Sequence, residues 1–369
     1  MDPRIRRHAG IIVDHSTDVA AGDRVLVAAQ PAAEDLAVAV FELLGERGAR
    51  PAMAYMNDTY LGSDRAVRSY LRNVDAEELP EPDHLRTLIE ASDVVIRVRG
   101  HDNATELSDV ASESHAAYRR AVQDVQQSML ATRWCLTQFP THAGAQLAGM
   151  SAEAYENFVW DAIIRDWDAQ REHQARMVEI LDPAAEVHIV SGERTDVTMS
   201  VDGYRTINDY GENNLPGGEV FTAPDPESVE GTVHFDMPLY HKGQEVLGAS
   251  LEFEDGVVVG HAAERNVDVL TGILDTDEGA RRLGELGIGM NRAIDRFSYN
   301  MLFDEKMGDT VHMAVGMAYA ECVPADAEPN RSAEHVDMIV DMSEDSYIEV
   351  DGEVVQRDGT FVFEDGFEG

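Results

Sequence analysis

The sequence predicts two domains of different class. One is an α/β domain with a mainly parallel sheet over residues 1–181, and the other is an α+β domain with a mainly antiparallel sheet over residues 182–369. In the first half, short apolar runs alternate with stretches of helical periodicity, whereas the second half has short strand-like runs separated by turns. Between them, Asp182-Pro183 ends a long helical stretch, because a residue before proline disfavours helical backbone. A chain of 369 residues is long enough for two apolar cores.

The first half has the pattern of a parallel sheet that helices cover on both faces. Strands that are apolar throughout and alternate with helices are typical of this architecture. No Gly-x-Gly-x-x-Gly motif or phosphate loop follows any of these strands, so we expect no nucleotide site. The predicted strands are 24–29, 50–55, 93–98 and 134–137, and the predicted helices are 32–47, 82–91 and 114–132.

The second half has the pattern of an antiparallel sheet. Met150-Ser151-Ala152-Glu153 is a capping box that opens a helical stretch, which runs with one or more breaks to Leu181. Residues 251–259 predict a hairpin closed at Asp255-Gly256. We also predict strands at 187–190, 196–201, 231–236, 311–319 and 335–342, and a short helix at 276–283 that ends near Gly284.

The charge of the chain is strongly negative. Its 29 Lys and Arg residues face 70 Asp and Glu residues, which gives a net charge of −41, and the only lysines are Lys242 and Lys306. Such a surface repels nucleic acid and anionic lipid, so neither is expected as a partner. The acids are dispersed along the chain, which indicates adaptation to high salt and a halophilic source. In so acidic a chain, any single glutamate is weak evidence for a site.

The cysteines and the N-terminus indicate a soluble cytoplasmic protein. Cys135 and Cys322 both lie in apolar sequence, which is typical of reduced core residues and predicts neither a disulfide nor a thiolate metal site. No apolar run follows the basic residues at the N-terminus, so no secretory signal is predicted. No stretch approaches the roughly 18 apolar residues of a membrane span.

Carboxylates and histidines of the second half form a candidate metal site. His335 and Asp337 are two residues apart in a predicted strand, so their side chains leave the same face. His312 shares its strand face with the small residues Ala314 and Gly316, which leave room for an ion but also suit a histidine that fills a core gap. An ordinary half-exposed strand is the alternative interpretation for His335 and Asp337. Mixed carboxylate and imidazole ligands suit one or two divalent ions.

Three glutamates extend this set, with unequal support. Glu219 follows two glycines and enters an apolar run, which is unusual for a surface acid. Glu285 follows the glycine that we expect to end the helix 276–283 and enters a glycine-rich apolar run. Glu305 is the weakest of the three, because its neighbours Asp304 and Lys306 are typical of a solvated turn. Tyr319 faces away from His312 in an uninterrupted strand, and only a bend, for instance at Gly316, brings it back.

These segments together resemble the M29 family of metallo-aminopeptidases, the group of aminopeptidase T and aminopeptidase S. The resemblance covers most of the chain, and the fragments follow in the family's order and spacing. They are Ala21-Gly22-Asp23-Arg24-Val25, Leu147-Ala148-Gly149-Met150-Ser151, Arg194-Thr195-Asp196-Val197-Thr198, the run from Asn214 to Pro224, Leu283-Gly284-Glu285, the run from Leu302 to Lys306, His312 with Tyr319, and His335-Val336-Asp337.

The resemblance implies a metal-dependent aminopeptidase that acts on short peptides, and a homodimer. Two divalent ions (Zn, Co, Mn or Mg) would share a bridging hydroxide, polarise the peptide carbonyl and anchor the free amine of the substrate. Glu285 is the expected general base and also an expected ligand. Tyr319 is expected to donate a hydrogen bond to the tetrahedral oxyanion. The matching ligand positions are Glu219, Glu285, Glu305, His312, His335 and Asp337.

Two other functions stay open at this point. Dihydroxypyridine dioxygenases look similar to this family but use a single non-haem iron, which His312, His335 and Asp337 would also suit. Glu219 and Glu285 match acids of the peptidases and are not expected in the dioxygenases, so their presence favours the peptidase. A solute-binding module with a decayed site would require the loss of ligand-type residues, and no such loss is visible.

Overall fold

The computed structural model describes residues 2–56, 62–76, 79–241 and 244–368. The chain forms two compact units, residues 1–165 with 211–217, and residues 166–210 with 218–369. The helix over residues 167–181 therefore groups with the second unit, and the short segment 211–217 returns to the first. The domain boundary near residue 182 stays a prediction.

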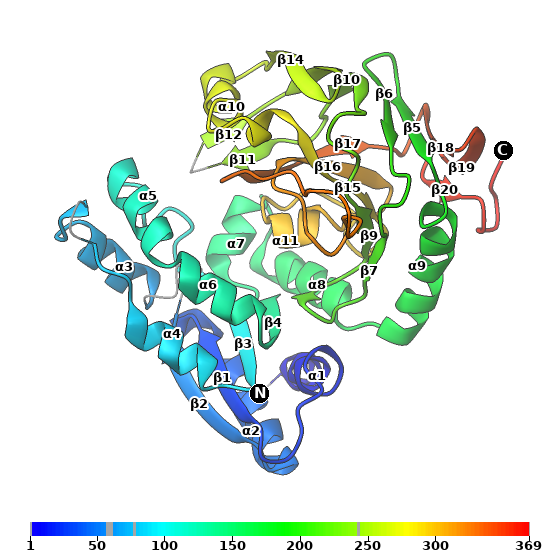
Figure 1. The fold of residues 1–369 in the computed structure, drawn as a ribbon. Coiled ribbons are helices and arrows are strands. Elements are labelled where there is room, and N and C mark those ends of the chain that lie inside the picture. Colours follow the sequence, from blue (N-terminus) through cyan, green and yellow to red (C-terminus); the bar gives the residue numbers. More distant parts are fainter. Residues whose placement is uncertain (1, 57–61, 77–78, 242–243, 369) are drawn as a thin grey trace. The chain divides into compact units, whose positions relative to one another are not determined.

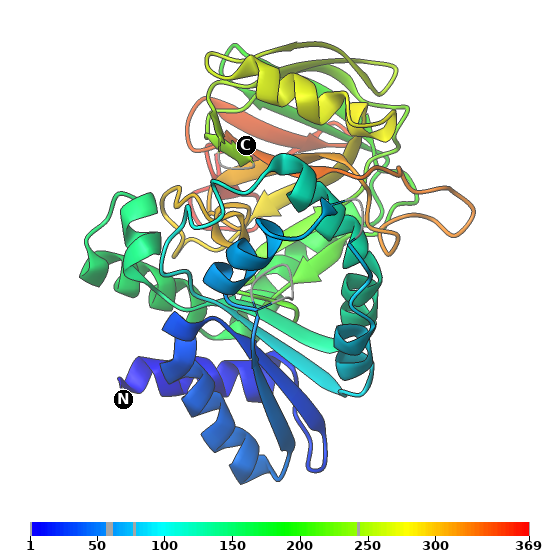
Figure 2. The same ribbon diagram turned by 90° about the vertical axis from the view of Figure 1, so that its left-hand side faces the viewer.

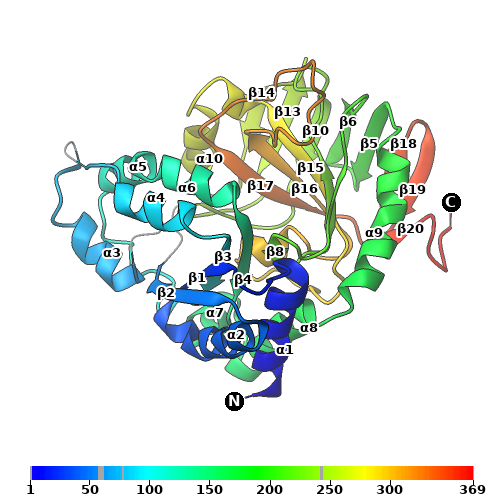
Figure 3. The ribbon, with the colours of Figure 1, turned by 60° about the horizontal axis from the view of Figure 1, so that its bottom comes forward.

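The first unit is built on a parallel sheet with the strand order β2-β1-β3-β4-β8. All four strands predicted in this half are present. In Figures 1 and 3, α2 lies against one face of the sheet, and α4 and α6 lie against the other. The strands are β1 (Arg24–Ala29), β2 (Arg50–Tyr55), β3 (Val94–Arg99), β4 (Arg133–Gln138) and β8 (Asn214–Leu215). The helices are α1 (Pro3–Ile11), α2 (Glu34–Arg47), α3 (Asp64–Leu71), α4 (Asp83–Glu90), α5 (Ser112–Ala121), α6 (Gln123–Leu130), α7 (His142–Leu147) and α8 (Ala152–Ile163).

The predicted single helix 114–132 is wrong in one respect, because the structure has two helices there. The backbone leaves helical geometry at Val122, where φ is −98° and ψ is 4°, and this residue separates α5 from α6. Tyr118, Val122, Val125 and Met129 are all buried and keep a helical spacing across the break. The periodicity of the sequence therefore did not reveal it.

Over its described residues, the second unit contains two antiparallel sheets and a separate pair of strands. The larger sheet has the order β14-β13-β10-β6-β5-β18-β19-β20, the smaller has the order β17-β16-β15-β9-β7, and β11 pairs with β12. The prediction of a mainly antiparallel sheet in this half is confirmed, including the hairpin closed at Asp255-Gly256. The strands of the larger sheet are β5 (Glu186–Ser191), β6 (Thr195–Ser200), β10 (Glu230–His234), β13 (Ser250–Glu254), β14 (Val257–Ala262), β18 (Ser346–Val350), β19 (Glu353–Arg357) and β20 (Thr360–Phe361).

The remaining elements of this unit include the strands that carry the candidate site. Helix α10 packs against β12 and β14, as Figure 2 shows, and buries Leu270, Ile273 and Leu274. The elements are β7 (Ile207–Asp209), β9 (Glu219–Thr222), β15 (Leu283–Gly289), β16 (Thr310–Gly316), β17 (His335–Asp341), β11 (Leu239–His241), β12 (Gln244–Val246), α9 (Trp167–Leu181), α10 (Val267–Leu274) and α11 (Met301–Asp304).

The predicted helix 276–283 is wrong. Helix α10 ends at Leu274, and only a single 3₁₀ turn, Gly279–Arg281, follows it, with the side chain of Asp277 accepting from the N–H of Ala280 at 2.9 Å. Leu283 already belongs to β15, which is hydrogen-bonded to β16 on one side and to β9 on the other. Two ladders of strand hydrogen bonds outweigh the weak helical preference of this short stretch.

Alternation along the smaller sheet separates the core from the candidate site. Val311, Met313 and Val315 of β16, with Val336 and Met338 of β17, join a core cluster that also includes buried residues of the larger sheet. Successive side chains of a strand point to opposite faces. The polar residues of these strands therefore lie on the face of the smaller sheet that is turned away from this core.

Two further expectations concern the whole chain. Cys135 and Cys322 are both buried, as expected of core residues. In the part of the chain that the structure describes, no helix combines the length and the apolar character needed to cross a membrane.

Candidate metal centre

Four neighbouring strands bring five of the six predicted ligands together. In the strand register, Glu285 of β15 is opposite Ala314 of β16, which is in turn opposite Asp337 of β17. Glu219 begins β9, and its partner in β15 is Gly289. Glu219, Glu285 and His312 are buried. Glu285 therefore lies within a fully buried strand, not after a helix as the sequence suggested.

Glycine at position 287 makes room for the imidazole of His312. The two residues are partners in the β15–β16 ladder. A Cβ atom on Gly287 would come within 2.0 Å of His312 Nε2, far inside van der Waals contact. The ring therefore lies directly over the backbone of β15, and a larger residue at position 287 would displace it.

The side chains form two ligand groups that share Glu285. Glu219, Glu285 and His312 each offer one ligand atom, and these atoms lie within 4.8 Å of one another. The same holds for Glu285, His335 and Asp337. The shared carboxylate turns one oxygen to each group, because Oε1 is 3.3 Å from His312 Nε2 and Oε2 is 3.3 Å from His335 Nε2.

The distances fit ligands of a common ion. His312 Nε2 is also 3.3 Å from Glu219 Oε2, and His335 Nε2 is 3.6 Å from Asp337 Oδ1. Two ligand atoms of a tetrahedral ion, each about 2.0–2.1 Å from it, lie roughly 3.3 Å apart. Glu219 Oε2 and Glu285 Oε2 are buried, and among the described residues neither accepts a hydrogen bond. Buried carboxylate oxygens without a donor are what a bound cation satisfies.

The orientation of His335 points to the same conclusion. Its Nδ1 lies 2.8 Å from the carbonyl oxygen of Met317, to which it donates. In the neutral ring, Nε2 then carries a lone pair that faces the oxygens of Glu285 and Asp337. A cation between them removes this repulsion, and a backbone carbonyl on the other ring nitrogen is the usual way in which a metal-binding histidine is oriented.

The pKa values show how strongly this region favours positive charge. Burial lowers the pKa of both imidazoles, but the surrounding carboxylates outweigh it and raise the pKa of His312 to about 9 and that of His335 to about 10. Burial raises the pKa of Glu219 to about 8 against the opposing charge of Lys306, and that of Asp337 to about 6. Burial alone would raise the pKa of Glu285, but the neighbouring rings of His312 and His335 outweigh it and lower the pKa to about 2.

Glu305 lies beside these groups but belongs to neither of them. It follows α11, and its carboxylate is hydrogen-bonded to the ammonium of Lys306. The expected solvated turn is wrong, because both Asp304 and Lys306 are fully buried. Asp304 accepts hydrogen bonds from the N–H and the hydroxyl of Ser298, both at 2.7 Å, and thereby holds the loop that carries Glu305.

Tyr319 reaches the site because β16 ends before it. The strand stops at Gly316, and the ring centroid of Tyr319 lies 5.1 Å from that of His335 and 5.8 Å from that of Phe221. Partial burial and the carboxylates of Glu285 and Asp337 raise the pKa of Tyr319 well above its usual value. The phenol is therefore protonated at neutral pH and can donate a hydrogen bond.

Two residues at this site did not emerge from the sequence. Lys306 Nζ lies 2.9 Å from Glu219 Oε1 and 3.7 Å from Asp209 Oδ2. Asp209 is the neighbour of Glu219 in the β7–β9 ladder. The only signal for Lys306 was its rarity, since the chain has 29 basic residues and just two of them are lysines.

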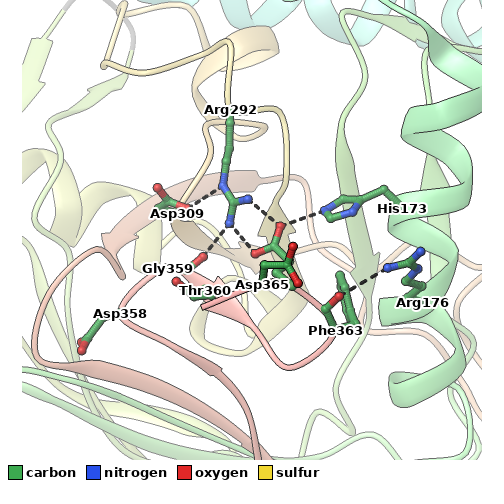
Figure 4. Close-up of a pocket in the computed structure, with 10 residues that line it drawn as sticks. His173, Arg176, Arg292, Asp309, Asp358, Gly359, Thr360, Phe363 and Asp365 are labelled. Carbon is green, nitrogen blue, oxygen red and sulfur yellow. Dashed lines mark hydrogen bonds and ion pairs between the residues drawn. The ribbon is translucent and has the colours of Figure 1, made fainter. Parts of the chain in front are cut away.

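A second polar cluster lies near the C-terminus, around a pocket of about 650 Å³ (Figure 4). Arg292 is its centre and donates to Glu364 at 2.8 Å, to Asp309 at 3.1 Å and to the carbonyl of Gly359 at 2.8 Å. His173 is 3.3 Å from the same Glu364 carboxylate. These contacts tie the C-terminal segment to the loop after β15.

Comparison with known proteins identifies the family. The model of the thermophilic metalloprotease family M29 matches residues 1–367. The chain belongs to this family. Aminopeptidase 2 of Geobacillus stearothermophilus is 29% identical to it over 98% of both chains, and aminopeptidase T of Thermus aquaticus is 33% identical over 67% of each. The prediction of a metallo-aminopeptidase of the M29 family is thereby confirmed.

Structural comparison agrees with the family. The structure of AmpT from Thermus thermophilus matches this M29 chain with a TM-score of 0.85 and 25% identity, over 97% of this chain and 99% of that one. The 2,5-dihydroxypyridine dioxygenase of Pseudomonas putida matches with a TM-score of 0.58 and 15% identity, over 98% and 97%. The second likeness shows a common fold and nothing about chemistry.

Proposed function

We propose that this M29 protein removes the N-terminal residue of short peptides, using two divalent ions that Glu285 joins. The sharing of Glu285 between two ligand groups is the observation that carries this proposal. A single ion would need only one of the groups. Glu219 and His312 would hold one ion with Glu285, and His335 and Asp337 would hold the other. Zn, Co, Mn and Mg are the candidate metals, and all of them accept mixed oxygen and nitrogen ligands to different degrees.

Glu305 is also a proposed ligand, with weaker support than the other five. Its carboxylate is already engaged by Lys306, and it lies outside both ligand groups. Lys306 engages only its Oε1, and the other oxygen would bind the ion. We therefore place Glu305 at the edge of the centre, on the side of Glu219.

The residues around the centre have complementary roles in the proposed hydrolysis. Two divalent ions supply a water-derived nucleophile at neutral pH and polarise the peptide carbonyl. The protonated Tyr319 hydroxyl would donate to the oxyanion that develops on that carbonyl. A carboxylate beside the attacking water would take its proton and pass it to the leaving amine.

Glu285 has two proposed roles, as ligand and as general base. The geometry favours the ligand role, since both of its oxygens already face an imidazole. The low pKa of about 2 also makes the carboxylate a weak base in this environment. The base role therefore requires one oxygen of Glu285 to exchange between an ion and the water.

The proposed test combines metal analysis with hydrolysis. The purified protein is assayed on aminoacyl-p-nitroanilides in high salt, before and after treatment with a chelator, and its metal content is measured by mass spectrometry. We expect up to two divalent ions per chain and hydrolysis that is lost with the chelator and restored by Zn²⁺, Co²⁺, Mn²⁺ or Mg²⁺. The same p-nitroanilides with an acetylated amine serve as the control and should not be cleaved, because an aminopeptidase needs the free amine.

Two outcomes would contradict the proposal. Hydrolysis that persists without metal would remove the ions from the chemistry. One iron per chain, with oxygen consumption on a dihydroxylated ring and no peptide cleavage, would support the dioxygenase alternative built on His312, His335 and Asp337.

The homodimer and the cytoplasmic location implied for this protein remain predictions. Light scattering coupled to size-exclusion chromatography gives the oligomeric state directly. A monomeric mass at micromolar concentration would contradict the expected dimer.

A further inference from the structure

Lys306 is a fully buried lysine that contacts three carboxylates. Its Nζ lies 2.9 Å from Glu219 Oε1, is hydrogen-bonded to Glu305 and lies 3.7 Å from Asp209 Oδ2. Charge-assisted hydrogen bonds of this kind are about twice as strong as neutral ones. The ammonium is not accessible to solvent, so it cannot contact a substrate, and its role must act through the residues that it touches.

The carboxylate of Glu219 connects Lys306 to the proposed metal centre. One of its oxygens, Oε1, accepts from Lys306, and the other, Oε2, lies 3.3 Å from His312 Nε2 in the ligand group. The ammonium and the ligand group therefore occupy different oxygens of the same carboxylate. Lys306 can therefore neutralise Glu219 while Oε2 of the same carboxylate stays directed at the ligand group.

The choice of lysine at this position is unusual for this chain. Of its 29 basic residues only two are lysines, so arginine serves almost every other cationic position. An ammonium is a compact charge that fits among several carboxylates. A guanidinium is planar and binds a single carboxylate best, through two parallel hydrogen bonds. Three acids that converge on one buried point require the compact cation.

The charges of the whole centre balance only when Lys306 is included. Its carboxylates belong to Asp209, Glu219, Glu285, Glu305 and Asp337, which together carry five negative charges. Two divalent ions and one ammonium carry five positive charges, with the histidines neutral as ligands. In the absence of ions, Lys306 is the cation that contacts Asp209, Glu219 and Glu305 together, and buried carboxylates without a counter-charge are strongly destabilising.

We propose that Lys306 is the built-in counter-ion of the metal centre, which keeps the carboxylates of Asp209, Glu219 and Glu305 compatible with the folded state before metal binds. This inference rests on the proposed two-metal function. Lys306 is thus a positioning residue. Its removal should make the stability of the fold depend on metal, because the ions would then replace the positive charge that Lys306 no longer gives to these acids.

The test compares the thermal unfolding of metal-free and Co²⁺-loaded proteins. Without metal, Lys306→Met should lower the Tm by about 10 °C, as expected when one partner of a buried ionic cluster is removed. With Co²⁺ bound, the decrease in Tm should be at most about half as large, because an ion that binds only the folded state raises the stability of the variant. Adding Asp209→Asn to Lys306→Met removes one of the acids that Lys306 faces and should restore part of the metal-free Tm.

A matched control removes a positive charge from the surface. Arg296 pairs with Asp295, and both side chains are more than half exposed. Arg296→Met changes the net charge by the same amount as Lys306→Met, and we expect a Tm close to that of the wild type in both states. If Lys306→Met does not fold in chelator, refolding it with Co²⁺ should recover soluble protein.

Different results would overturn the inference and the proposed function. An equal loss of Tm with and without Co²⁺, or no recovery on adding either Asp209→Asn or Co²⁺, would mean that Lys306 is only a packing residue. A wild-type Tm that responds to none of Zn²⁺, Co²⁺, Mn²⁺ or Mg²⁺ would contradict the metal centre itself. In that case the metal-free Tm of Lys306→Met, compared with that of Lys306→Met with Asp209→Asn, still tests the counter-ion role of Lys306.

Discussion

The acid stability of the protein is expected to depend on His8, which anchors the segment leading to Glu219. His8 is fully buried in α1, and its Nε2 lies 2.8 Å from the hydroxyl of Thr137. That hydroxyl donates to the carbonyl of Leu215 at 2.7 Å, so it must accept from His8 Nε2–H. Nδ1 is also buried and lacks a hydrogen-bond partner among the described residues, so a proton there would be an unpaired buried charge.

The size of the pH effect on the free energy of unfolding follows from the pKa of His8. Burial lowers it from 6.5 to about 3 in the folded protein. Between these values the unfolded chain binds the proton and the folded chain does not, so the free energy of unfolding is fully retained above pH 6.5 and falls as the pH decreases toward 3. The loss from this residue is about 2 kcal/mol at pH 5 and approaches about 5 kcal/mol below pH 3.

The assay compares urea unfolding of the wild type and His8→Gln at pH 7.5 and pH 5.0, at one salt concentration. Glutamine keeps an N–H donor for Thr137 but does not titrate in this range. Between the two pH values, the wild type should therefore lose about 2 kcal/mol more than His8→Gln. Thr137→Val is the control, because it removes the hydrogen bond but leaves His8 buried. The amount by which it lowers the free energy of unfolding relative to the wild type should therefore be similar at both pH values.

Equal losses for the wild type and His8→Gln would refute the reasoning. They would mean that His8 gains its proton without unfolding the first unit, either through local opening of α1 or through a partner for Nδ1. A ring that titrates in the folded protein near its ordinary pKa would lead to the same conclusion.

Three further predictions concern the centre, the surface and the C-terminal cluster. Glu285→Gln should lower aminopeptidase activity by at least about 100-fold and reduce the metal content below two ions per chain; full activity would exclude Glu285 both as base and as shared ligand. Because the net charge is −41, the Tm should rise between about 0.1 M and 1 M KCl as salt screens repulsion, and a Tm independent of salt would contradict this. Arg292→Met and Glu364→Gln should each lower the Tm by a few degrees, and the double variant should be little worse than Arg292→Met, whereas fully additive losses would show that the two side chains act independently.

The parts of the fold that were predictable are those set by local pattern. Apolar strands alternating with helices indicated the parallel sheet, and short strand-like runs separated by turns indicated the antiparallel strands. His335 and Asp337 share a face because side chains two apart in a strand point the same way, and this needs no knowledge of the rest of the chain. The helix predicted at 276–283 failed because the hydrogen bonds of β15 come from β9 and β16, which are distant in sequence.

Burial of the charged residues could not be predicted in the same way. Asp304-Glu305-Lys306 has the composition of a solvated turn, and only the surrounding strands and loops make it part of the interior. Asp209 likewise acquires its position through the pairing of β7 with β9. The sequence therefore identified side chains that share a strand face, but not the counter-charge that a distant loop delivers to them.

The contrast between the surface acids and the centre gives the physical reason for the proposed internal counter-ion in a chain of net charge −41. Exposed carboxylates are separated by solvent, and dissolved salt screens them over a Debye length of about 8–10 Å at 0.1–0.15 M. Glu219 and Glu285 are buried, so salt in the medium cannot reach them, and only fixed charges or bound ions can. Added KCl should therefore stabilise the wild type through its surface, yet it should not replace Lys306 or the proposed divalent ions at the centre. A recovery of metal-free Lys306→Met by KCl to the wild-type Tm would show that the centre is open to solvent, which would remove the physical reason for a built-in counter-ion.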